Sequence, residues 1–574
     1  MGAELDPIRL LARSHFMPKV KREARSRRTI IVGGVAGGAS CAARLRRLDE
    51  EAEIIMVERG PYISFANCGL PYHIGGVIDD RDSLLVQTPE SFRQRFSVEV
   101  RVLTEVVAID AEAQTVTLRD LENDSETDLS YDSLVLSPGA SPFLPPIEGV
   151  ALPGVHVLRT IPDMDRIIEA CEDSTPGHVT VVGGGFIGLE VAENMVHRGI
   201  DVTVVEMGPQ LMPNLDFEMA ASITDACVRH GVEVWTNTQL TAIKQAGDDL
   251  QIQTRDGKER STDLVMMAVG VRPTTELARG AGLVLSPRGY ITVDATLRTS
   301  DPNIFAIGDA IEVVHRVSAT SGPMPLAGPA NRQGRLVADI IAGRERTYCG
   351  PLGTSIIQVF DITAACTGIS EAAARRMDID HQVVWINAPS HASYYPGAET
   401  ITLKAIFDPA GGKILGAQGF GKDGVDKRID VLATAIAAGM TVAQLEELDL
   451  AYAPPFSSAK DPVNHLGSVA SGVLESDHPA CSWRVTEEEE DLLFVDVRTA
   501  SEFAAGTIDG AVNIPLEELR ARLDELPRDT QLVAFCQKGL RGYLAARILL
   551  QRGFEVRNLL GGYRLWQLVT DCQK

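Results

Sequence analysis

One cysteine stands in a segment whose residues favour thiol chemistry. Cys68 lies within the string Ser64-Phe65-Ala66-Asn67-Cys68-Gly69-Leu70-Pro71-Tyr72. No cysteine stands three or five positions away from it, so Cys68 has no neighbour with which to close a local disulfide. A thiolate here would attack a disulfide or persulfide, and its oxidised form would be a mixed disulfide, a persulfide or a sulfenate. We therefore predict that Cys68 is a redox-active nucleophile that works alone.

A second cysteine opens a short loop near the C-terminus. The run Cys536-Gln537-Lys538-Gly539-Leu540-Arg541 lies between an expected strand over residues 532–535 and a helix that starts near residue 542. Such a loop curls its backbone N–H groups around one point, where they and the helix dipole stabilise a thiolate or a persulfide. Lys538 and Arg541 would add positive charge. The sequence thus predicts a second catalytic sulfur at Cys536, with Lys538 and Arg541 as substrate-binding residues.

Two glycine-rich turns are expected to position this chemistry. An apolar run over residues 29–32 leads into Gly33-Gly34-Val35-Ala36-Gly37-Gly38 and a helical pattern, and the next apolar run ends at Glu58. The same order recurs with residues 179–182, Gly183-Gly184-Gly185-Phe186-Ile187-Gly188, a helix and a strand that ends at Glu206. Glycines at a helix start expose N–H groups to a pyrophosphate, and the acid accepts hydrogen bonds from ribose hydroxyls. We expect two dinucleotide-binding domains.

Further turns follow strands at Ser137-Pro138-Gly139, at Gly270 and at Ile307-Gly308-Asp309-Ala310. With the two glycine turns, their order resembles the flavoprotein disulfide reductases that bind two dinucleotides. The resemblance implies FAD at Gly33, Gly34, Val35, Ala36, Gly37, Gly38, Glu58, Ser137, Pro138, Gly139, Gly308, Asp309 and Ala310. It implies NADH at Gly183, Gly185, Phe186, Ile187, Gly188, Glu206 and Gly270. Asp309 would bond the ribityl chain of FAD, and hydride would pass from the nicotinamide through the flavin to Cys68.

Two electrostatic expectations accompany this resemblance. Because a carboxylate repels a 2′-phosphate, Glu206 favours NADH over NADPH. A helix start and an oxidised flavin beside Cys68 would depress the pKa of its thiol and make it a better nucleophile.

Three strings carry a narrower resemblance. The string from Ser64 to Tyr72, His391-Ala392-Ser393-Tyr394-Tyr395-Pro396-Gly397 and Ala451-Tyr452-Ala453-Pro454-Pro455 resemble coenzyme A-disulfide reductases and their persulfide-reductase relatives. The resemblance covers nearly all of residues 28–467. It implies a homodimer in which two tyrosines approach the sulfur of the partner subunit and donate a hydrogen bond or proton to the leaving thiolate. Tyr395 and Tyr452 are the preferred assignment, and the sequence leaves open whether Tyr394 takes the place of Tyr395.

Coenzyme A carries phosphates, so this resemblance also implies local cations. The positions that match the family's coenzyme A contacts are Ser40, Arg44, Arg47, Ser64, Asn67, Asn331 and Lys460. Arg44 and Arg47 are three residues apart on an expected helix and would share one face.

The C-terminal segment is similar to a single-domain rhodanese. The resemblance rests on Phe494-Val495-Asp496-Val497-Arg498, Gly510-Ala511-Val512-Asn513-Ile514-Pro515 and the Cys536 loop, although Thr507 stands where that family often has histidine. It implies that Cys536 carries sulfane sulfur as a persulfide. Together these resemblances predict an FAD-dependent NADH reductase of persulfide, polysulfide or coenzyme A disulfide, without a metal, that also transfers sulfane sulfur.

Two other functions share these features. In an NADH oxidase or peroxidase, Cys68 would cycle through a sulfenate, and the acceptor would be oxygen or peroxide. In a non-catalytic sulfur carrier, bound NADH would only report the redox state of the cell.

Composition limits the partners and the compartment. The chain of 574 residues has a net charge of −24, which repels nucleic acid backbones. Its nine cysteines include no CxxC pair, and no apolar run reaches the length of a membrane span, so we expect a cytoplasmic protein that binds neither nucleic acid nor membranes.

The predicted fold class is α/β, with two Rossmann-like domains, an α+β dimerisation domain and a C-terminal rhodanese-like domain. The expected boundaries are a disordered or non-native leader over 1–27, an FAD-binding domain over 28–148 and 276–345, an NADH-binding domain over 149–275, a dimerisation domain over 346–467, a linker rich in serine and glycine over 468–488 and a rhodanese domain over 489–574.

Overall fold

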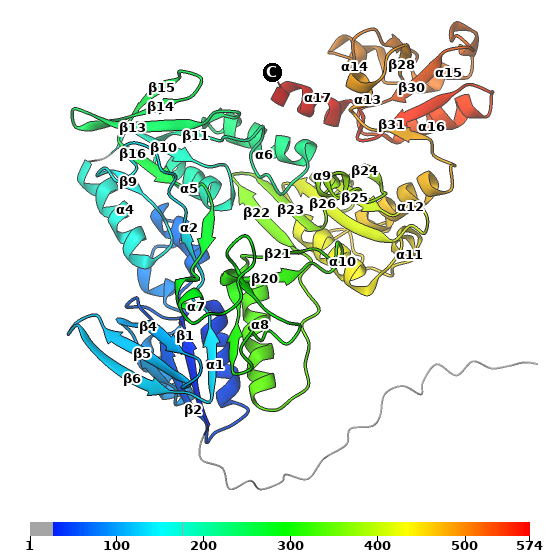
Figure 1. Ribbon diagram of the computed structural model, residues 1–574. Helices are drawn as coiled ribbons and strands as arrows, with labels where there is room; N and C mark the ends of the chain where they lie inside the picture. The colour runs from blue at the N-terminus through cyan, green and yellow to red at the C-terminus, as the bar shows by residue number, and fades with distance from the viewer. Residues whose placement is uncertain (1–26, 175, 574) are drawn as a thin grey trace, which may run out of the picture.

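The structure is a computed structural model that describes residues 27–174 and 176–573. The expected leader lies outside these residues except for Arg27. Figure 1 shows four successive units, which we call the first dinucleotide domain, the second dinucleotide domain, the third domain and the C-terminal domain. The C-terminal domain lies beside the third domain, on the side away from the first dinucleotide domain.

The first dinucleotide domain is built on a five-stranded parallel sheet with the order β19-β7-β1-β2-β3. Four of its strands, all except the edge strand β3, are short, mainly apolar runs that are largely buried, as is typical of parallel sheets. Because β19 comes from far downstream, two separate segments of the chain build this sheet. The strands are β1 (Arg28–Val32), β2 (Glu53–Val57), β3 (Glu99–Arg101), β7 (Ser133–Leu136) and β19 (Ile304–Ala306).

Two helices of this domain approach unusually closely. A Cβ atom on Gly334 of α8 (Ala327–Ile341) would lie 2.2 Å from the carbonyl oxygen of Gly37 in α1 (Ala36–Arg46). Only glycine permits that approach, which holds the second segment against the first. The remaining elements are η1 (Asn67–Gly69), α2 (Leu70–Ile74), η2 (Arg81–Leu84), α3 (Pro89–Phe96), β4 (Thr104–Asp110), β5 (Thr115–Asp120), β6 (Ser125–Ser130), α7 (Glu276–Gly280), β18 (Ile291–Thr292), η3 (Gly308–Ala310), β20 (Ile311–Val314) and β21 (Ser321–Pro323).

The second dinucleotide domain repeats the plan with the sheet order β12-β11-β10-β16-β9. Its first strand and helix, β10 and α5, enclose the second glycine turn. The elements are β8 (Ala140–Pro142), β9 (Val155–His156), α4 (Ile161–Ser174), β10 (His178–Val182), α5 (Phe186–His197), β11 (Asp201–Val205), α6 (Phe217–Arg229), β12 (Glu233–Trp235), β13 (Leu240–Ala246), β14 (Asp249–Thr254), β15 (Glu259–Thr262), β16 (Leu264–Met267) and β17 (Val271–Pro273).

The third domain is an antiparallel sheet of order β22-β23-β26-β25-β24 covered by helices. The strand pair β24 and β25 aligns Asn387 with Thr402, and its connection carries both Tyr394 and Tyr395. The elements are β22 (Ser355–Val359), β23 (Ile362–Gly368), α9 (Glu371–Arg376), β24 (Gln382–Pro389), β25 (Thr400–Phe407), β26 (Ile414–Gly421), α10 (Val425–Ala438), α11 (Val442–Glu446) and α12 (Pro462–Leu474).

The segment expected as a linker, residues 468–488, is ordered structure. Its first part completes α12, which Asp461 caps and in which Pro462 occupies the first turn. A glycine of this part lies in a packed position: a Cβ on Gly472 would lie 3.3 Å from the Cβ of His478. Its second part adds strand β27 (Ala480–Cys481) to the C-terminal sheet.

The C-terminal domain has a five-stranded parallel sheet of order β27-β31-β30-β28-β29. It is fastened to the rest of the chain by apolar side chains: Trp483, Leu560, Leu565 and Val569 belong to one core together with residues of the second and third domains. Its helix α17 packs against α6, as Figure 1 shows. The elements are α13 (Val485–Glu488), β28 (Leu492–Asp496), α14 (Ala500–Ala504), β29 (Val512–Asn513), α15 (Leu516–Leu519), η4 (Leu523–Glu525), β30 (Gln531–Phe535), α16 (Leu540–Leu550), β31 (Val556–Leu559) and α17 (Gly562–Gln573).

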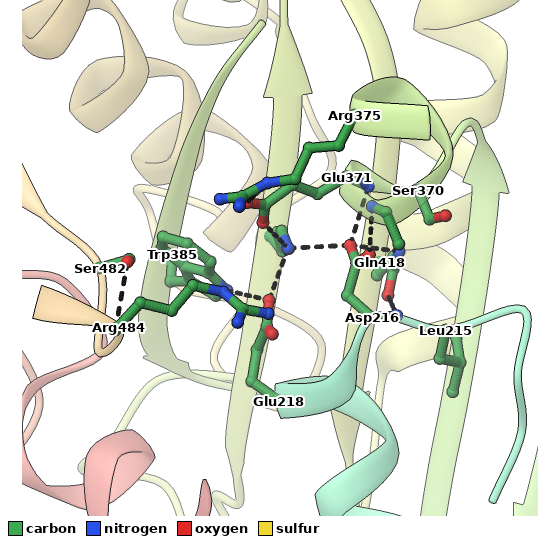
Figure 2. Close-up of polar contacts among 12 residues, drawn as sticks. Leu215, Asp216, Glu218, Ser370, Glu371, Arg375, Trp385, Gln418, Ser482 and Arg484 are labelled. Carbon is green, nitrogen blue, oxygen red and sulfur yellow. Dashed lines mark hydrogen bonds and ion pairs between the residues drawn. The ribbon is translucent and has the colours of Figure 1, made fainter. Parts of the chain in front are cut away.

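A buried ionic cluster joins the second and third domains. Figure 2 shows three carboxylates converging: Asp216 from the residue before α6, Glu218 from α6 and Glu371 from α9. The ammonium of Lys404 on β25 lies 2.8, 2.5 and 2.6 Å from their respective oxygens. Asp216 also accepts hydrogen bonds from the backbone nitrogens of Glu371 and Ala372. A buried cation needs this many partners to offset its lost hydration, so the two domains are held in one orientation.

Among residues 27–174 and 176–573, no helix is both long and apolar enough to cross a membrane.

Candidate active site

Both glycine turns and Cys68 open into a single cleft of about 1920 Å³. The cleft runs along the carboxyl ends of β1 and β10, where doubly wound sheets bind their ligands. The structure therefore brings together most of the residues predicted to bind cofactors. Those that line the cleft are Gly33, Val35, Ala36, Gly37, Glu58, Ser137, Pro138, Gly139, Gly185, Phe186, Ile187, Gly270, Gly308 and Asp309.

The first turn has the backbone that a dinucleotide requires. Gly33 has a φ of +97°, and a Cβ there would lie 2.1 Å from the carbonyl oxygen of Ser137. A Cβ on Gly38 would lie 1.9 Å from the oxygen of Gly33. Side chains at these positions would fill the space between strand and helix, so the turn fits a pyrophosphate against the start of α1. The carboxylate of Glu58 accepts hydrogen bonds from the backbone nitrogens of Gly34 at 2.9 Å and Gly60 at 2.8 Å.

The second turn reproduces this geometry. Gly183 has a φ of +109°, and a Cβ on Gly188 would lie 2.0 Å from its carbonyl oxygen. Glu206 accepts from the nitrogens of Gly184 at 2.8 Å and Gly208 at 2.6 Å, as Glu58 does in the first turn. A Cβ on Gly185 would meet nothing within 4 Å, so the start of α5 is open to a ligand. Both turns therefore fit a dinucleotide, and each acid keeps free acceptor capacity for ribose hydroxyls.

Asp309 lies deep in the cleft at η3. Burial raises the pKa of its carboxyl, and the guanidinium of Arg159 acts in the opposite direction. Arg159, which lines the cleft, donates to the Ser141 hydroxyl at 2.9 Å and to the Pro138 carbonyl oxygen at 3.3 Å. Sequence reasoning did not single out Arg159, because nothing near it in the chain marks a cofactor site.

Cys68 is exposed to the cleft at the start of a short helical segment. The surrounding protein does not lower the pKa of its thiol, contrary to expectation. Burial by the cleft walls raises that pKa, and the charges of Glu190 and Asp309 raise it further. The reason is local: α2 has five residues and a weak dipole, while two carboxyl groups lie near the sulfur.

Glu190 is a residue of this cleft that the sequence analysis missed. It lies in the first turns of α5, and it shares a hydrogen bond with the hydroxyl of Tyr72 in α2, the helix that follows Cys68. Burial first, and then the charge of Glu193, raise the pKa of Glu190 to about 7. The available signal was a pair of acids, Glu190 and Glu193, in an otherwise apolar stretch immediately after the second glycine turn.

A second, smaller cavity of about 350 Å³ lies beside the first and contains Ser40, Arg47, Ser64 and Asn331. These are four of the predicted coenzyme A contacts. Ser40 and Asn331 are hydrogen-bonded to each other. Arg95 of α3 and Arg335 of α8 also line it, and no local motif had marked them. In the described part of the chain, the side chains of Arg47, Arg95 and Arg335 have neither a hydrogen bond nor an ion pair, so three cations face one cavity.

Three other predicted contacts lie elsewhere. Arg44 does not share a binding face with Arg47, because its guanidinium is paired with the buried carboxylate of Asp339 on α8 at 2.7 Å. Asn67 lines the large cleft beside Cys68. Lys460 is exposed in the third domain and lines neither cavity of its own protomer.

The predicted tyrosines lie on the surface of the third domain. The hydroxyl oxygens of Tyr394 and Tyr452 are 3.0 Å apart, whereas the ring of Tyr395 packs against His391 at 5.6 Å. All three tyrosines are exposed, and none of these described residues lines the cleft that holds Cys68 in its own protomer.

The Cys536 loop has the predicted form. The sulfur is buried and accepts a hydrogen bond from the backbone nitrogen of Gly539 at 3.2 Å, at the start of α16. The side chains of the two predicted cations lie differently from expectation. The ammonium of Lys538 donates to the Thr400 hydroxyl of the third domain at 3.1 Å, and Arg541 forms a bidentate pair with Glu502 while also interacting with the Cys536 sulfur.

Comparison with known proteins matches these units. Residues 27–334 match the family model described as pyridine nucleotide-disulphide oxidoreductase. The chain belongs to this family. Residues 354–462 match the dimerisation domain of the same family, and residues 484–568 match a rhodanese-like domain. The predicted fold class is thereby confirmed, and the chain is a flavin- and NAD-dependent oxidoreductase with a fused rhodanese domain.

Three relatives are similar over most of their length. The coenzyme A disulfide reductase of Staphylococcus haemolyticus (strain JCSC1435) is 36% identical over 77% of this chain and 98% of that protein. The structure of reduced Bacillus anthracis CoADR-RHD has a TM-score of 0.93 and 49% identity, covering 96% of this chain and 99% of that one. The structure of an NAD-dependent persulfide reductase from A. fulgidus has a TM-score of 0.89 and 39% identity, covering 94% and 100%.

Proposed function

We propose that this protein uses NADH to reduce sulfur–sulfur bonds of coenzyme A persulfide, coenzyme A disulfide or polysulfide. The observation that carries the proposal is the exposed thiol of Cys68 in the cleft that both glycine turns share. The activities of the coenzyme A disulfide reductase and the persulfide reductase to which the chain is similar support the substrate class. Glu206 accepts a hydrogen bond from the backbone nitrogen of Gly184 at the second turn. Its carboxylate would repel a 2′-phosphate, which supports NADH over NADPH.

The chain's own residues divide the work as follows. Glu58, Asp309 and the first turn hold FAD, and Glu206 with the second turn holds NADH. The thiolate of Cys68 attacks the outer sulfur of a persulfide, forms a new S–S bond to it and releases the coenzyme A thiolate. When bound, FAD and NADH would supply the two electrons with which the persulfide on Cys68 is released as hydrosulfide and Cys68 returns to the thiol. Asn67, which accepts a hydrogen bond from the backbone nitrogen of Cys68 at 3.1 Å, orients the nucleophile.

A proton donor for the leaving thiolate comes from a second subunit in this proposal. Tyr394, Tyr395 and Tyr452 lie outside the cleft of their own protomer, and their exposed hydroxyls could enter the cleft of a partner in a homodimer. A phenol there would protonate the leaving sulfur. The match to a dimerisation domain supports this arrangement.

Coenzyme A is proposed to bind the smaller cavity. Arg47, Arg95 and Arg335 supply charge for its phosphates, and Ser40 with Asn331 supplies hydrogen-bonding groups. Ser64, which has a φ of +45°, stands between this cavity and the segment of Cys68. In a protein whose net charge is −24, this cluster is the local attraction that an anionic substrate needs.

Cys536 is proposed to carry sulfane sulfur as a persulfide and to exchange it with the coenzyme A pool that Cys68 reduces. The N–H of Gly539 and the start of α16 support an anionic sulfur at this position. The nine free cysteines are consistent with a reducing compartment, and we infer a cytoplasmic location.

The proposal is tested by NADH consumption and by intact mass. Cys68→Ser should lose turnover with coenzyme A persulfide, and purified wild type should carry an adduct on Cys68 that a reductant removes. Undiminished turnover in the variant would refute the proposal. Faster turnover with peroxide than with coenzyme A persulfide would favour a peroxidase instead. If Cys536→Ser leaves turnover with every persulfide donor unchanged, the sulfur exchange between the two sites is wrong.

A further inference from the structure

One side-chain amide of the third domain contacts both walls of the Cys536 loop. The Nδ2 atom of Asn387, near the end of β24, donates to the carbonyl oxygen of Lys538 at 3.1 Å and to that of Gly561 at 2.9 Å. Its Oδ1 atom accepts from the hydroxyl of Thr402 on β25 at 2.8 Å. Carbonyl oxygens only accept hydrogen bonds, so the amide nitrogen must face the C-terminal domain, and Thr402 holds it there.

The two carbonyls belong to the segments that form the loop. Lys538 lies two residues after Cys536, and Gly561 begins the turn beneath it. In that turn the backbone nitrogen of Tyr563 donates to the carbonyl oxygen of Cys536 at 2.8 Å. A Cβ on Gly562 would lie only 2.4 Å from the same oxygen. Asn387 therefore ties the loop and its support to one point outside their own domain.

The loop has intrinsic freedom that such a tie would limit. Gly539 has a φ of +116°, and Gly561 and Gly562 have φ values of +77° and +62°. Glycines pay the largest entropic cost on ordering, so outside contacts decide how narrowly this backbone is held. A second contact acts in the same direction, since the Lys538 ammonium donates to Thr400, also on β25.

We propose that Asn387 is a positioning residue for sulfur transfer at Cys536, through which the reductase part of the chain holds the sulfurtransferase loop in its reactive shape. The amide acts through the loop backbone, which keeps the N–H of Gly539 directed at the sulfur. In the reaction with thiosulfate, the Cys536 thiolate takes the outer sulfur, sulfite leaves and a persulfide forms. Cyanide then takes that sulfur as thiocyanate and restores the thiolate, so both anionic states of Cys536 depend on the same donors.

This inference rests on the proposed role of Cys536, and the test separates the two. Asn387→Asp keeps the size of the side chain but places a carboxylate oxygen opposite two carbonyl oxygens. In the full-length holoenzyme we expect kcat for transfer from thiosulfate to cyanide to fall about ten-fold, the scale of one to two lost hydrogen bonds. The rate at which iodoacetamide alkylates Cys536 at one fixed pH should also fall, because the donors around its sulfur converge less well. NADH-dependent reduction of coenzyme A disulfide should change less than about two-fold, since Cys68 lies elsewhere.

A matched control exists in the same domain. Asn464 of α12 donates from Nδ2 to the carbonyl oxygens of Leu445 at 3.0 Å and Leu448 at 2.9 Å, away from the C-terminal domain. Asn464→Asp should leave both sulfur transfer and the rate of Cys536 alkylation at that pH unchanged. Thr400→Val, which removes only the Lys538 contact, should give a smaller effect than Asn387→Asp.

The outcomes are distinct. If Asn387→Asp transfers sulfur like wild type, or if it loses no more than Asn464→Asp, the inference is overturned. An equal loss of sulfur transfer and NADH turnover would also overturn it, because that pattern indicates general destabilisation. If wild type itself transfers no sulfane sulfur, the proposed role of Cys536 fails first. Should Asn387→Asp not fold, Asn387→Ala removes the donor without adding charge, and the same comparisons apply.

Discussion

The hydroxyl oxygens of Tyr394 and Tyr452 lie 3.0 Å apart on an exposed face of the third domain. The side chains come from separate segments, and Tyr394 is 74% exposed. The neighbouring Tyr395, which sequence reasoning had paired with Tyr452, is turned toward His391 instead. The geometry therefore favours Tyr394 and Tyr452 as the pair available to a partner subunit.

This relationship predicts a difference between two adjacent tyrosines. Tyr394→Phe and Tyr452→Phe should each lower kcat with coenzyme A persulfide at least ten-fold, because a positioned proton donor contributes on the order of a hundred-fold or more. Tyr395→Phe should stay within about two-fold of wild type. Steady-state NADH consumption measures all three variants. A large loss confined to Tyr395→Phe would restore the original assignment.

The smaller cavity predicts selective effects of arginine substitutions. Arg335→Ala and Arg47→Ala should each raise KM for coenzyme A persulfide about ten-fold or more, because each removes a charge-assisted contact worth roughly 1.5–3 kcal/mol. They should leave KM for inorganic polysulfide nearly unchanged. Arg44→Met should instead lower the free energy of unfolding, since it leaves Asp339 buried without its Arg44 partner. Equal KM effects with both acceptors would argue against coenzyme A binding here.

Glu190 predicts the direction of a change in thiol reactivity. Its negative charge raises the pKa of Cys68, and its own pKa of about 7 means that this charge develops near neutral pH. Glu190→Gln removes the charge, so the pH at which Cys68 is half alkylated by iodoacetamide should fall. Peptide mass spectrometry measures the rate at each pH. Glu193→Gln is the control. Glu193 raises the pKa of Glu190, but it is not among the groups that raise the pKa of Cys68. An unchanged or higher midpoint in Glu190→Gln would contradict the prediction.

The ionic cluster between the second and third domains predicts a large loss of stability. Lys404→Met leaves three buried carboxyl groups without their shared cation and should cost about 3–5 kcal/mol in free energy of unfolding. Lys422→Met breaks an exposed pair with Asp361 and should cost less than about 1 kcal/mol. Denaturant unfolding compares the two variants. Similar losses would mean that the cluster does not hold the domains together.

The sequence was sufficient where spacing along the chain determines geometry. The glycine turns, the acids Glu58 and Glu206 and the loop after Cys536 lie in consecutive strand, turn and helix segments, so their relative positions follow from local structure. Residues from distant segments could not be placed in this way. Arg44 was assigned to a substrate because nothing local reveals Asp339 on α8, and Arg95 and Arg335 reach their cavity only through tertiary packing. Residues 468–474, which belong to α12, were expected to form part of a linker because composition alone cannot distinguish a flexible segment from a packed helix.

The C-terminal domain shares an apolar core with the second and third domains, through Trp483, Leu560, Leu565 and Val569. This shared core limits how far the C-terminal domain can move. Swinging the C-terminal domain toward the flavin cleft would expose these side chains to water, at roughly 1.5–3 kcal/mol each. Movement of the whole C-terminal domain therefore costs far more free energy than diffusion of a small thiol. If sulfur is exchanged between Cys536 and Cys68 as proposed above, a small thiol such as coenzyme A must carry it between the two sites.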